Sequence, residues 1–159
     1  MAEYANLRLA NQLCFALYTA THAITRAYRS QLGELGLTYP QYLVLLALWD
    51  SPDASSRGQS VKVLAQRLDL DSAALTPLLK RMAAAGLVER ERDSEDERVM
   101  RIRIAPAAQA LKGHLARVQN AVVCRSGLSP AEFSALRDTL HRLTQTIAVG
   151  QEREPELTP

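Results

Sequence analysis

The order of short elements predicted between residues 61 and 104 constrains this chain more than any other feature of its sequence. Apolar spacing and turn residues predict, in order, a helix at 61–68, a turn at 69–71, a helix at 72–85 that Gly86 ends, a strand at 87–92, a charged turn at 93–97 and a strand at 98–104. In the last segment apolar residues alternate with arginines, which is the period of a half-buried strand. A helix pair around a tight turn, followed by a β-hairpin, is a winged helix-turn-helix.

The two predicted helices share an apolar seam and carry polar residues on the outside. The seam consists of Leu64, Ala65, Leu68, Leu70, Leu75, Leu79 and Met82. The opposite face of the second helix carries Ser72, Thr76, Lys80 and Arg81. In a helix-turn-helix the second helix lies in the major groove of DNA. We therefore predict that these four residues contact bases or phosphates.

The hairpin supplies three further candidates for DNA contact. We expect Arg98 to reach the minor groove, where an arginine responds to the width of the groove. Asp96, two residues earlier, is expected to hold this arginine in place, and Arg92 belongs to the same predicted surface. A turn that is merely solvated would carry the same charges, and this alternative stays open.

Charge is concentrated in this central region, although the whole chain is nearly neutral. Residues 57–104 hold 10 of the 19 lysines and arginines and 8 of the 17 acidic residues, whereas the net charge is only +2. The small net charge excludes a polycation, an acidic tail and a disordered chain. A concentration of basic residues is typical of a nucleic-acid reader, but a solvated helical face would show the same pattern.

Helical patterns flank the central region on both sides. They are predicted at 5–35, which Gly36 ends, at 42–49 after a capping box from Thr38 to Gln41, at 106–124, and at 130–149 after a second capping box from Ser129 to Glu132. The segment 42–49 is apolar nearly all round and is expected to be buried, and the polar end after Gly150 is expected to fray. The apolar stripes of the outer helices are longer than one small core can cover. We therefore predict a homodimer that binds a pseudo-palindromic operator in double-stranded DNA.

Together these elements predict one mainly α-helical domain with a small β-hairpin wing over residues 1–159. Residues 5–35 and 106–149 are expected to form the dimerisation helices. Residues 38–104 are expected to form the winged helix-turn-helix, with a polar loop at 51–60.

The sequence argues against an enzyme. It has no glycine-rich phosphate loop and no His/Cys cluster with metal-ligand spacing, so we expect no cofactor and no metal. The longest apolar runs, of about ten residues, are too short to span a bilayer. No export segment is evident, so we expect no membrane partner and a reducing cytoplasm as the compartment.

Four segments make the chain similar to a known family. They are NQLCFALYTA at 11–20, LGLTYPQYLVLLALWD at 35–50, LDSAALTPLLKRM at 70–82 and RDSEDERVM at 92–100. The layout resembles the MarR (multiple antibiotic resistance regulator) family of repressors over nearly the whole chain, and these segments resemble its organic hydroperoxide resistance regulators. The resemblance implies that Cys14 is the peroxide-reacting thiol, supported by Tyr18 and Tyr28. It also implies that Cys124 is the resolving cysteine of the two-cysteine subgroup.

From the residues alone, a cysteine such as Cys14 on a helical stripe is more often a small buried hydrophobic residue than a sensor. No Lys, Arg or His lies within residues 10–18, and the predicted mid-helix position gains little from the helix dipole. Tyr18, one turn away, is one candidate hydrogen-bond donor. Tyr28 lies about 21 Å further along the axis, so it can reach only the Cys14 of a second subunit. Tyr39 is a third candidate donor, or simply a core residue.

Four interpretations of the function remain at this point. The leading one is a dimeric repressor that an organic hydroperoxide switches by oxidising Cys14. A disulfide to Cys124 of the partner subunit, or to a small external thiol, would then release the DNA. The second is a repressor of the same fold that a small phenolic or aromatic ligand releases, with both cysteines inert. A thiol peroxidase that carries a winged helix and a winged-helix module for protein–protein contact are the other two.

Overall fold

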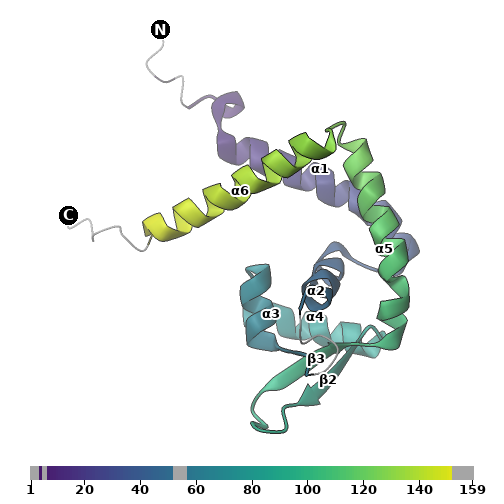
Figure 1. Ribbon diagram of the computed structural model, residues 1–159. Helices are drawn as coiled ribbons and strands as arrows, with labels where there is room; N and C mark the ends of the chain where they lie inside the picture. The colour runs from purple at the N-terminus through teal and green to yellow at the C-terminus, as the bar shows by residue number, and fades with distance from the viewer. Residues whose placement is uncertain (1–3, 5–6, 52–56, 152–159) are drawn as a thin grey trace, which may run out of the picture. The chain divides into compact units, whose positions relative to one another are not determined.

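The computed structural model describes residue 4, residues 7–51 and residues 57–151. Its elements are η2 (Leu9–Asn11), α1 (Leu13–Glu34), α2 (Tyr39–Trp49), β1 (Gln59–Ser60), α3 (Val61–Leu68), α4 (Ser72–Ala84), β2 (Val88–Arg92), β3 (Met100–Ile104), α5 (Pro106–Arg125) and α6 (Pro130–Gln151). They confirm the predicted fold class, a mainly helical chain with a small antiparallel sheet (Figure 1). The chain divides into two compact units, residues 1–119 and 120–159, and the boundary lies within α5.

Helix α1 begins later than predicted. The predicted start at Ala5 lies outside the described residues, and α1 begins at Leu13. The cause is Gln12, whose extended backbone (ψ 116°) separates α1 from the 3₁₀ helix η2. The amide of Gln12 bonds to the carbonyl of Leu9 at 3.1 Å, which closes that short helix on itself. At the other end α1 stops at Glu34, as predicted within one residue.

The predicted turn and capping box between α1 and α2 are confirmed. Gly36 has a φ of +67°, a left-handed conformation that favours glycine, directly after the end of α1. The Thr38 amide donates to Gln41 Oε1 at 2.8 Å, and Thr38 caps α2 in return. As predicted, α2 is largely buried, with Val44, Leu45 and Leu48 fully inaccessible to solvent.

The helix pair α3–α4 matches the predicted helix-turn-helix. Ser60 caps α3, because its Oγ accepts from the amide of Val63 at 3.3 Å. Asp69 adopts a left-handed conformation (φ +52°) and ends α3, and Asp71 caps α4 by accepting from the amide of Ala73 at 2.9 Å. These local bonds fix the tight turn between the two helices.

The predicted apolar seam is confirmed at five positions and wrong at one. Five of its members are buried, namely Leu64, Ala65, Leu75, Leu79 and Met82. Leu68 is half-buried, but Leu70 is 40% exposed. Leu70 lies in the turn after the left-handed Asp69, where helical spacing no longer determines which side a residue faces. Leu78, which the pattern missed, is buried instead.

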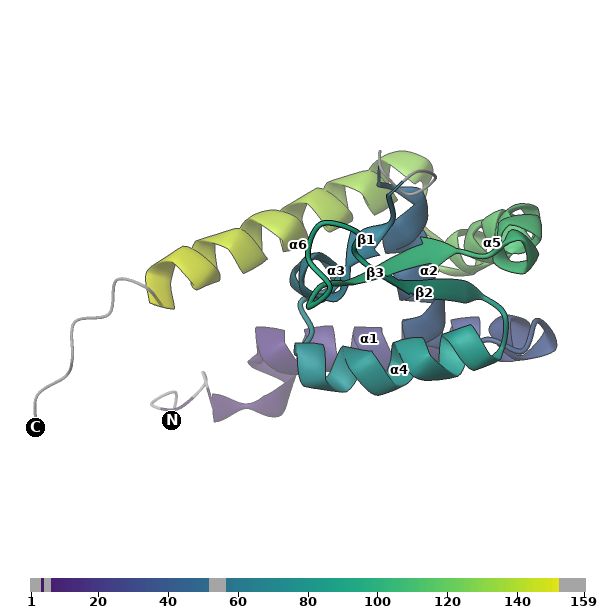
Figure 2. The ribbon, with the colours of Figure 1, turned by 90° about the horizontal axis from the view of Figure 1, so that it is seen from below.

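The wing contains one strand more than predicted. Strands β2 and β3 form the predicted antiparallel hairpin, with Val88 opposite Ile104 and Arg92 opposite Met100. The short strand β1 pairs with the other side of β3, so that Gln59 lies opposite Ile102 and the sheet order is β1-β3-β2 (Figure 2). Its two residues are too few to produce an alternating pattern, which is why the sequence did not predict it.

Helices α5 and α6 also follow their predicted ranges closely. Ser129 and Glu132 form the predicted capping box of α6, with the Ser129 amide 2.9 Å from Glu132 Oε2. These bonds from Ser129 hold the pKa of Glu132 below its ordinary value. Residues 152–159, predicted to fray, lie outside the described residues, as do residues 52–56 of the predicted polar loop. No helix in the described ranges is long and apolar enough to cross a membrane.

Candidate nucleic-acid interface and thiol site

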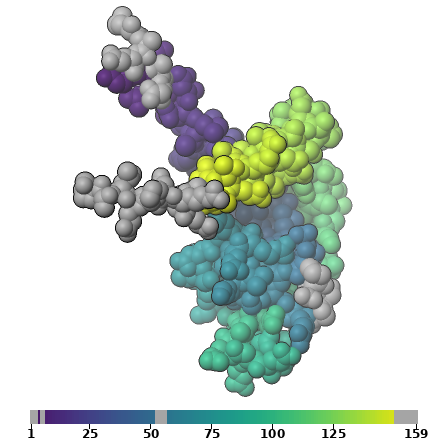
Figure 3. All heavy atoms as spheres, turned by 60° about the vertical axis from the view of Figure 1, so that its left-hand side comes forward, coloured from purple at the N-terminus to yellow at the C-terminus, as the bar shows by residue number. Residues whose placement is uncertain are grey.

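The four residues predicted to read DNA lie on the outer side of α4. Ser72, Lys80 and Arg81 are exposed, whereas Thr76 is half-buried. The Thr76 hydroxyl donates to the carbonyl of Ser72 at 2.8 Å, so it is already bonded within the helix. Helix α4 packs against α3 and β2 on its inner side. The outer side of α4 and the tip of the wing belong to the same unit, and the wing reaches the surface at the bottom of Figure 3.

The tip of the wing is organised by Asp93, which the sequence did not single out. Its carboxylate accepts from the backbone amides of Glu95 at 2.9 Å and Asp96 at 3.2 Å, and from Arg101 on the opposite strand. The amide of Glu95 and the guanidinium of Arg101 hold the pKa of Asp93 below its ordinary value. An aspartate that begins a polar turn typically bonds to amides two or three residues ahead, and that signal was available in the sequence.

Arg98 projects from this turn, and Asp96 bonds to it. Asp96 Oδ1 accepts from Arg98 Nε at 3.2 Å and from the Arg98 amide at 3.0 Å. The Arg98 side chain is nevertheless 92% exposed. Arg92 lies at the other side of the turn and donates to the carbonyl of Glu97 at 2.7 Å. The turn therefore presents one arginine outward and uses another to close itself.

The remaining arginines of β3 are engaged in ion pairs. Arg101 pairs with Asp93, and Arg103 pairs with Glu91 and, at 3.6 Å, with Glu89. Both arginines are only about one-third exposed. Their charges are largely compensated within the sheet, so Arg98 is the cation of the hairpin best placed to meet a phosphate or a groove.

Both cysteines are exposed free thiols, Cys14 on α1 and Cys124 on α5. The predicted mid-helix position of Cys14 is wrong. Because α1 begins at Leu13, Cys14 is the second residue of the helix and lies in its first turn. The backbone N–H groups of a first turn lack partners within the helix and favour nearby negative charge. Cys14 therefore lies at the N-terminal end of α1, a placement that the sequence did not reveal.

The predicted supporting tyrosines fall into two places. Tyr18 lies one turn after Cys14 on α1, is 61% exposed, and packs its ring edge-on against His22 with the centroids 4.4 Å apart. Tyr28 and Tyr39 lie together, with ring centroids 5.3 Å apart, where α1 meets α2. As expected from the length of the helix, Tyr28 is on the same helix as Cys14 but fourteen residues away from it.

A third tyrosine, Tyr42, completes this cluster and was missed from the sequence. Its ring centroid lies 5.4 Å from that of Tyr28 and 6.1 Å from that of Tyr39. Burial raises the pKa of all three phenols, most strongly that of Tyr42. Desolvation is the largest cause of the raised pKa of each phenol, and the side chains of Tyr28 and Tyr42 also interact with each other. The spacing of Tyr39 and Tyr42, one helical turn apart, was the available signal.

This geometry can be compared with known proteins. The MarR family profile matches residues 35–99. The chain is 36% identical over 145 residues to the organic hydroperoxide resistance transcriptional regulator of Bacillus subtilis, a match that covers 91% of this chain and 95% of that relative. The chain belongs to the MarR family of transcriptional regulators. Membership confirms the predicted winged helix-turn-helix and the prediction that the protein is a regulator and not an enzyme.

Two further relatives of this MarR protein are informative. The chain is 48% identical over 132 residues to the HTH-type transcriptional regulator TtmR of Methylorubrum extorquens, covering 83% of this chain but less than two thirds (65%) of that relative. AbfR, a protein of Staphylococcus epidermidis, has been solved in its reduced form bound to DNA. That structure matches with a TM-score of 0.72 and 34% identity, over 92% of this chain and 96% of AbfR. AbfR has also been solved in a disulfide form, which matches with a TM-score of 0.61 and 35% identity over 88% of this chain and 95% of that one.

Within the ranges that the structure describes, no group of three or more His, Cys, Asp or Glu side chains could hold a metal ion.

Proposed function

We propose that this MarR regulator is a dimeric repressor that binds a pseudo-palindromic operator with α4 in the major groove and the wing in the minor groove. Ser72, Thr76, Lys80 and Arg81 would contact the major groove, and their positions on the outer side of α4 support this assignment. On the wing, Arg98 would enter the minor groove while Asp96 and Arg92 shape the turn that carries it. The solved complex of reduced AbfR with DNA supports the proposal that this chain binds DNA.

The proposed dimer would cover apolar side chains that the single chain leaves exposed. On α1 these include Leu13 at 58% and Ile24 at 46% exposure. On α6 they include Leu136 at 50% and Ile147 at 53%. Such stripes on helices outside the winged region are typical of an interface between two copies. The segments 5–35 and 106–149 are the proposed dimerisation helices, and with residues 38–104 they would form the single domain predicted for residues 1–159.

The proposed signal is an organic hydroperoxide that oxidises Cys14. The thiolate attacks the distal peroxide oxygen, the O–O bond breaks, and the organic fragment leaves as an alcohol after taking up a proton. Cys14 becomes a sulfenic acid. The Cys124 thiol of the partner subunit then attacks this sulfur, water leaves, and a disulfide forms. In a reducing cytoplasm, the proposed compartment, thiols would reverse this change.

The tyrosine cluster suits the proposed support of the thiolate. Because burial raises their pKa, Tyr28 and Tyr39 stay protonated and can act as hydrogen-bond donors at physiological pH. Each protonated phenol carries one O–H that it can donate. We propose that Tyr28 and Tyr39 donate to Cys14 of the partner subunit, and that Tyr18 donates from the same helix as Cys14.

One observation carries the redox proposal: Cys14 is an exposed thiol in the first turn of α1, in a chain similar over nearly its whole length to a regulator named for organic hydroperoxide resistance. A disulfide between subunits would join two dimerisation helices and change the spacing of the two copies of α4. A dimer whose two α4 helices match the spacing of two major grooves would then lose affinity for the operator, so oxidation would release the DNA.

The experiment is a gel shift with DNA selected from a random pool by the reduced protein, run with and without cumene hydroperoxide. We expect the peroxide to release the DNA from the wild type, a reductant to restore binding, and Cys14→Ser to remain bound throughout. Non-reducing electrophoresis should show a covalent dimer that is absent from both Cys14→Ser and Cys124→Ser. If Cys14→Ser still releases DNA, the redox proposal is wrong. If Cys124→Ser still releases DNA, an external thiol resolves the sulfenic acid.

A further inference from the structure

The outward side of α4 is centred on small apolar residues. Ala73, Pro77, Lys80 and Ala84 recur at steps of four, three and four residues, which places them along one line of the helix. All four are exposed. The side directly opposite is buried, and it consists of Leu75, Leu78, Leu79 and Met82. The centre of the exposed side therefore carries only one polar side chain, that of Lys80.

The other polar residues of α4 lie to either side of this line. Ser72 and Thr76 flank it on one side, and Arg81 flanks it on the other. The Thr76 hydroxyl donates its proton to the carbonyl of Ser72, so that proton is already used within the helix. The first half of the exposed line thus offers apolar contact and no side-chain hydrogen bond.

Pro77 is an unusual residue for the middle of a helix. A proline has no backbone N–H, so the carbonyl of Ala73 does not receive the bond that position 77 would otherwise donate. Proline is the least favourable residue in a helix interior for this reason. Helix α4 nevertheless runs without interruption from Ser72 to Ala84. Because the Pro77 ring is exposed, it adds nothing to the core, and its presence calls for an explanation outside folding.

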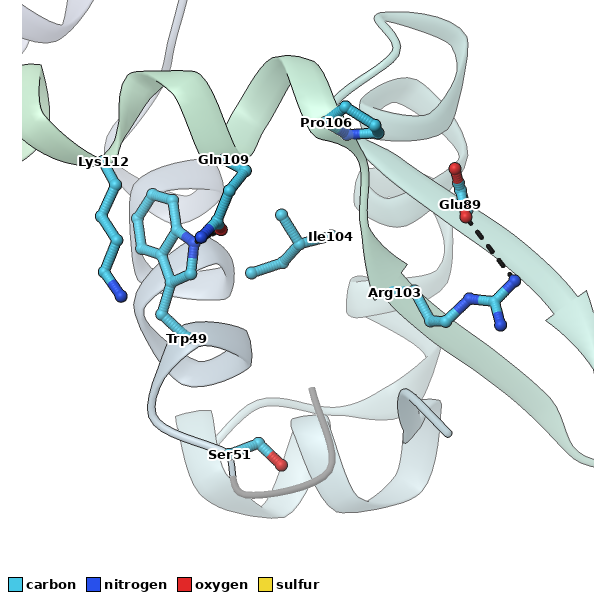
Figure 4. A pocket seen from close by; sticks show the side chains of 8 residues that line it. All are labelled: Trp49, Ser51, Glu89, Arg103, Ile104, Pro106, Gln109 and Lys112. Atoms are coloured by element: carbon cyan, nitrogen blue, oxygen red, sulfur yellow. Dashed lines mark hydrogen bonds and ion pairs between the residues drawn. The ribbon is translucent and has the colours of Figure 1, made fainter. Parts of the chain in front are cut away.

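The arginines of the neighbouring strand β3 are committed to carboxylates. Arginine makes the commonest specific contact with guanine in the major groove, through two hydrogen bonds. Arg103 extends along the sheet towards Glu89, one of its ion-pair partners (Figure 4). Arg101 is paired with Asp93. Contacts that distinguish one base from another in the major groove therefore fall to α4 itself.

We propose that Ala73 and Pro77 contact the C5-methyl group of thymine, so that each half-site of the operator carries a thymine opposite this pair. The proposal rests on the proposed binding of α4 in the major groove, and it names the base that is recognised there. Thymine is the only base of DNA that presents a methyl group in the major groove, and small apolar side chains contact it. A methyl contact needs no hydrogen bond, which matches the chemistry of this part of α4.

The position of the pair along α4 agrees with this role. The N-terminal residues of a recognition helix contact the base edges, and Ala73 and Pro77 lie in the first half of α4. Ala84, on the same line, is the last residue of the helix and lies away from that end. Lys80 and Arg81 follow one turn after Pro77, and their exposed positive charges suit the phosphates on the edges of the groove.

Uracil provides the test, because it pairs as thymine does and lacks only the C5-methyl group. The reduced full-length protein is titrated, by fluorescence anisotropy at physiological salt, with the DNA that it selects from a random pool. In a series of duplexes, each thymine of the half-sites is replaced by deoxyuridine at matching positions of both half-sites. We expect one or two positions at which uracil weakens binding by roughly fourfold for each half-site, the effect of losing one methyl contact. Uracil outside the half-sites should leave the affinity unchanged.

Two variants connect this preference to the two side chains. Pro77→Ser replaces the ring by a small polar group, and α4 tolerates the change because serine is the better helix former. Ala73→Gly removes the methyl group of Ala73. Each variant should bind thymine and uracil alike at one or more of the sensitive positions. Ala84→Gly makes the same change on the same line at the end of α4, and it should keep the full preference for thymine.

The outcomes separate this proposal from the proposed function. If the protein binds the selected DNA but accepts uracil at every thymine of the half-sites, the methyl contact is wrong, whereas DNA binding stands. The methyl contact is also wrong if both Ala73→Gly and Pro77→Ser keep the wild-type preference, or if the selected half-sites contain no thymine. If the protein selects no DNA from the pool, the proposed repressor function fails together with this proposal.

Discussion

Asp93 and Arg101 face each other across the base of the wing turn, and the guanidinium of Arg101 donates to the carboxylate of Asp93. With side chains 13% and 31% exposed, they form the most buried ion pair among the described residues. The same carboxylate accepts from two backbone amides of the turn that leads to Arg98. The position of the exposed arginine thus depends on a charge that lies several residues before it.

This dependence predicts how acid affects the protein. The pKa of Asp93 is lower in the folded chain than its ordinary value of 3.8, so the unfolded chain binds more protons in acid. The Asp93 carboxylate therefore stabilises the fold at pH values above its ordinary pKa. This contribution is lost as the pH falls through the lower pKa that Asp93 has in the folded chain. Asp93→Asn should show a shallower loss of stability than the wild type in urea titrations between about pH 5 and about pH 2. Asp138→Asn, which removes an exposed carboxylate on α6, is the control. Parallel curves for wild type and Asp93→Asn would contradict this role.

Arg98→Ala should weaken binding to the selected DNA by roughly 1–3 kcal/mol, because the side chain is expected to read a groove. The measurement is a fluorescence-anisotropy titration at physiological salt. Arg137→Ala serves as the matched control, since it removes an exposed arginine of α6 that pairs with its neighbour Asp138. An unchanged affinity for Arg98→Ala would remove this residue from the proposed interface.

The apolar stripe of α6 predicts the effect of a single charge on assembly. Ile147 is 53% exposed in the single chain and would be buried by a second copy. Ile147→Glu should shift sedimentation-equilibrium profiles at micromolar concentration from dimer towards monomer, because burying an unpaired carboxylate is costly. Gln145→Glu introduces the same charge at an exposed polar position nearby and should leave the dimer intact. A wild-type protein that sediments as a monomer would rule out the proposed dimer.

Much of the fold could be predicted because its boundaries are set by local bonds. Thr38 and Gln41 bond to each other within four residues, as do Ser129 and Glu132, so the helix starts they mark are visible in the sequence. Gly86, with a φ of +68°, likewise ends α4 where predicted. The boundaries of helices and turns that depend on such short-range contacts are predicted from the sequence to within one or two residues.

What the sequence could not predict depends on backbone geometry or on distant contacts. The extended conformation of Gln12 moves the start of α1 to Leu13 and brings Cys14 into the first turn. The sequence has no glycine or proline at this point that would indicate the break. The bond between Trp49 and Gln109 joins residues 60 positions apart. Tyr42 was predicted to be buried, but its partner Tyr28 lies on another helix. Each of these contacts forms only when separate elements pack together.

The tyrosine cluster makes the sharpest prediction about the proposed thiol chemistry. If the Tyr28 hydroxyl donates to the Cys14 thiolate of the partner subunit, Tyr28→Phe removes a hydrogen bond to a charged group, and Cys14 oxidation should slow by roughly tenfold or more. Tyr42→Phe removes the neighbouring hydroxyl with which the Tyr28 side chain interacts. It should slow oxidation less than Tyr28→Phe does, because it acts through Tyr28 and not on the sulfur itself.

The rate of sulfenic acid formation with cumene hydroperoxide measures this order, in a Cys124→Ser background where no internal thiol removes the product. Tyr4→Phe is the control, since Tyr4 is 68% exposed and lies outside the cluster. We expect Tyr4→Phe to react as fast as the parent, Tyr42→Phe to react more slowly, and Tyr28→Phe to react most slowly. If Tyr28→Phe reacts as fast as the parent, the phenols are core residues that pack α1 on α2, and the thiolate depends on the first turn of α1 alone.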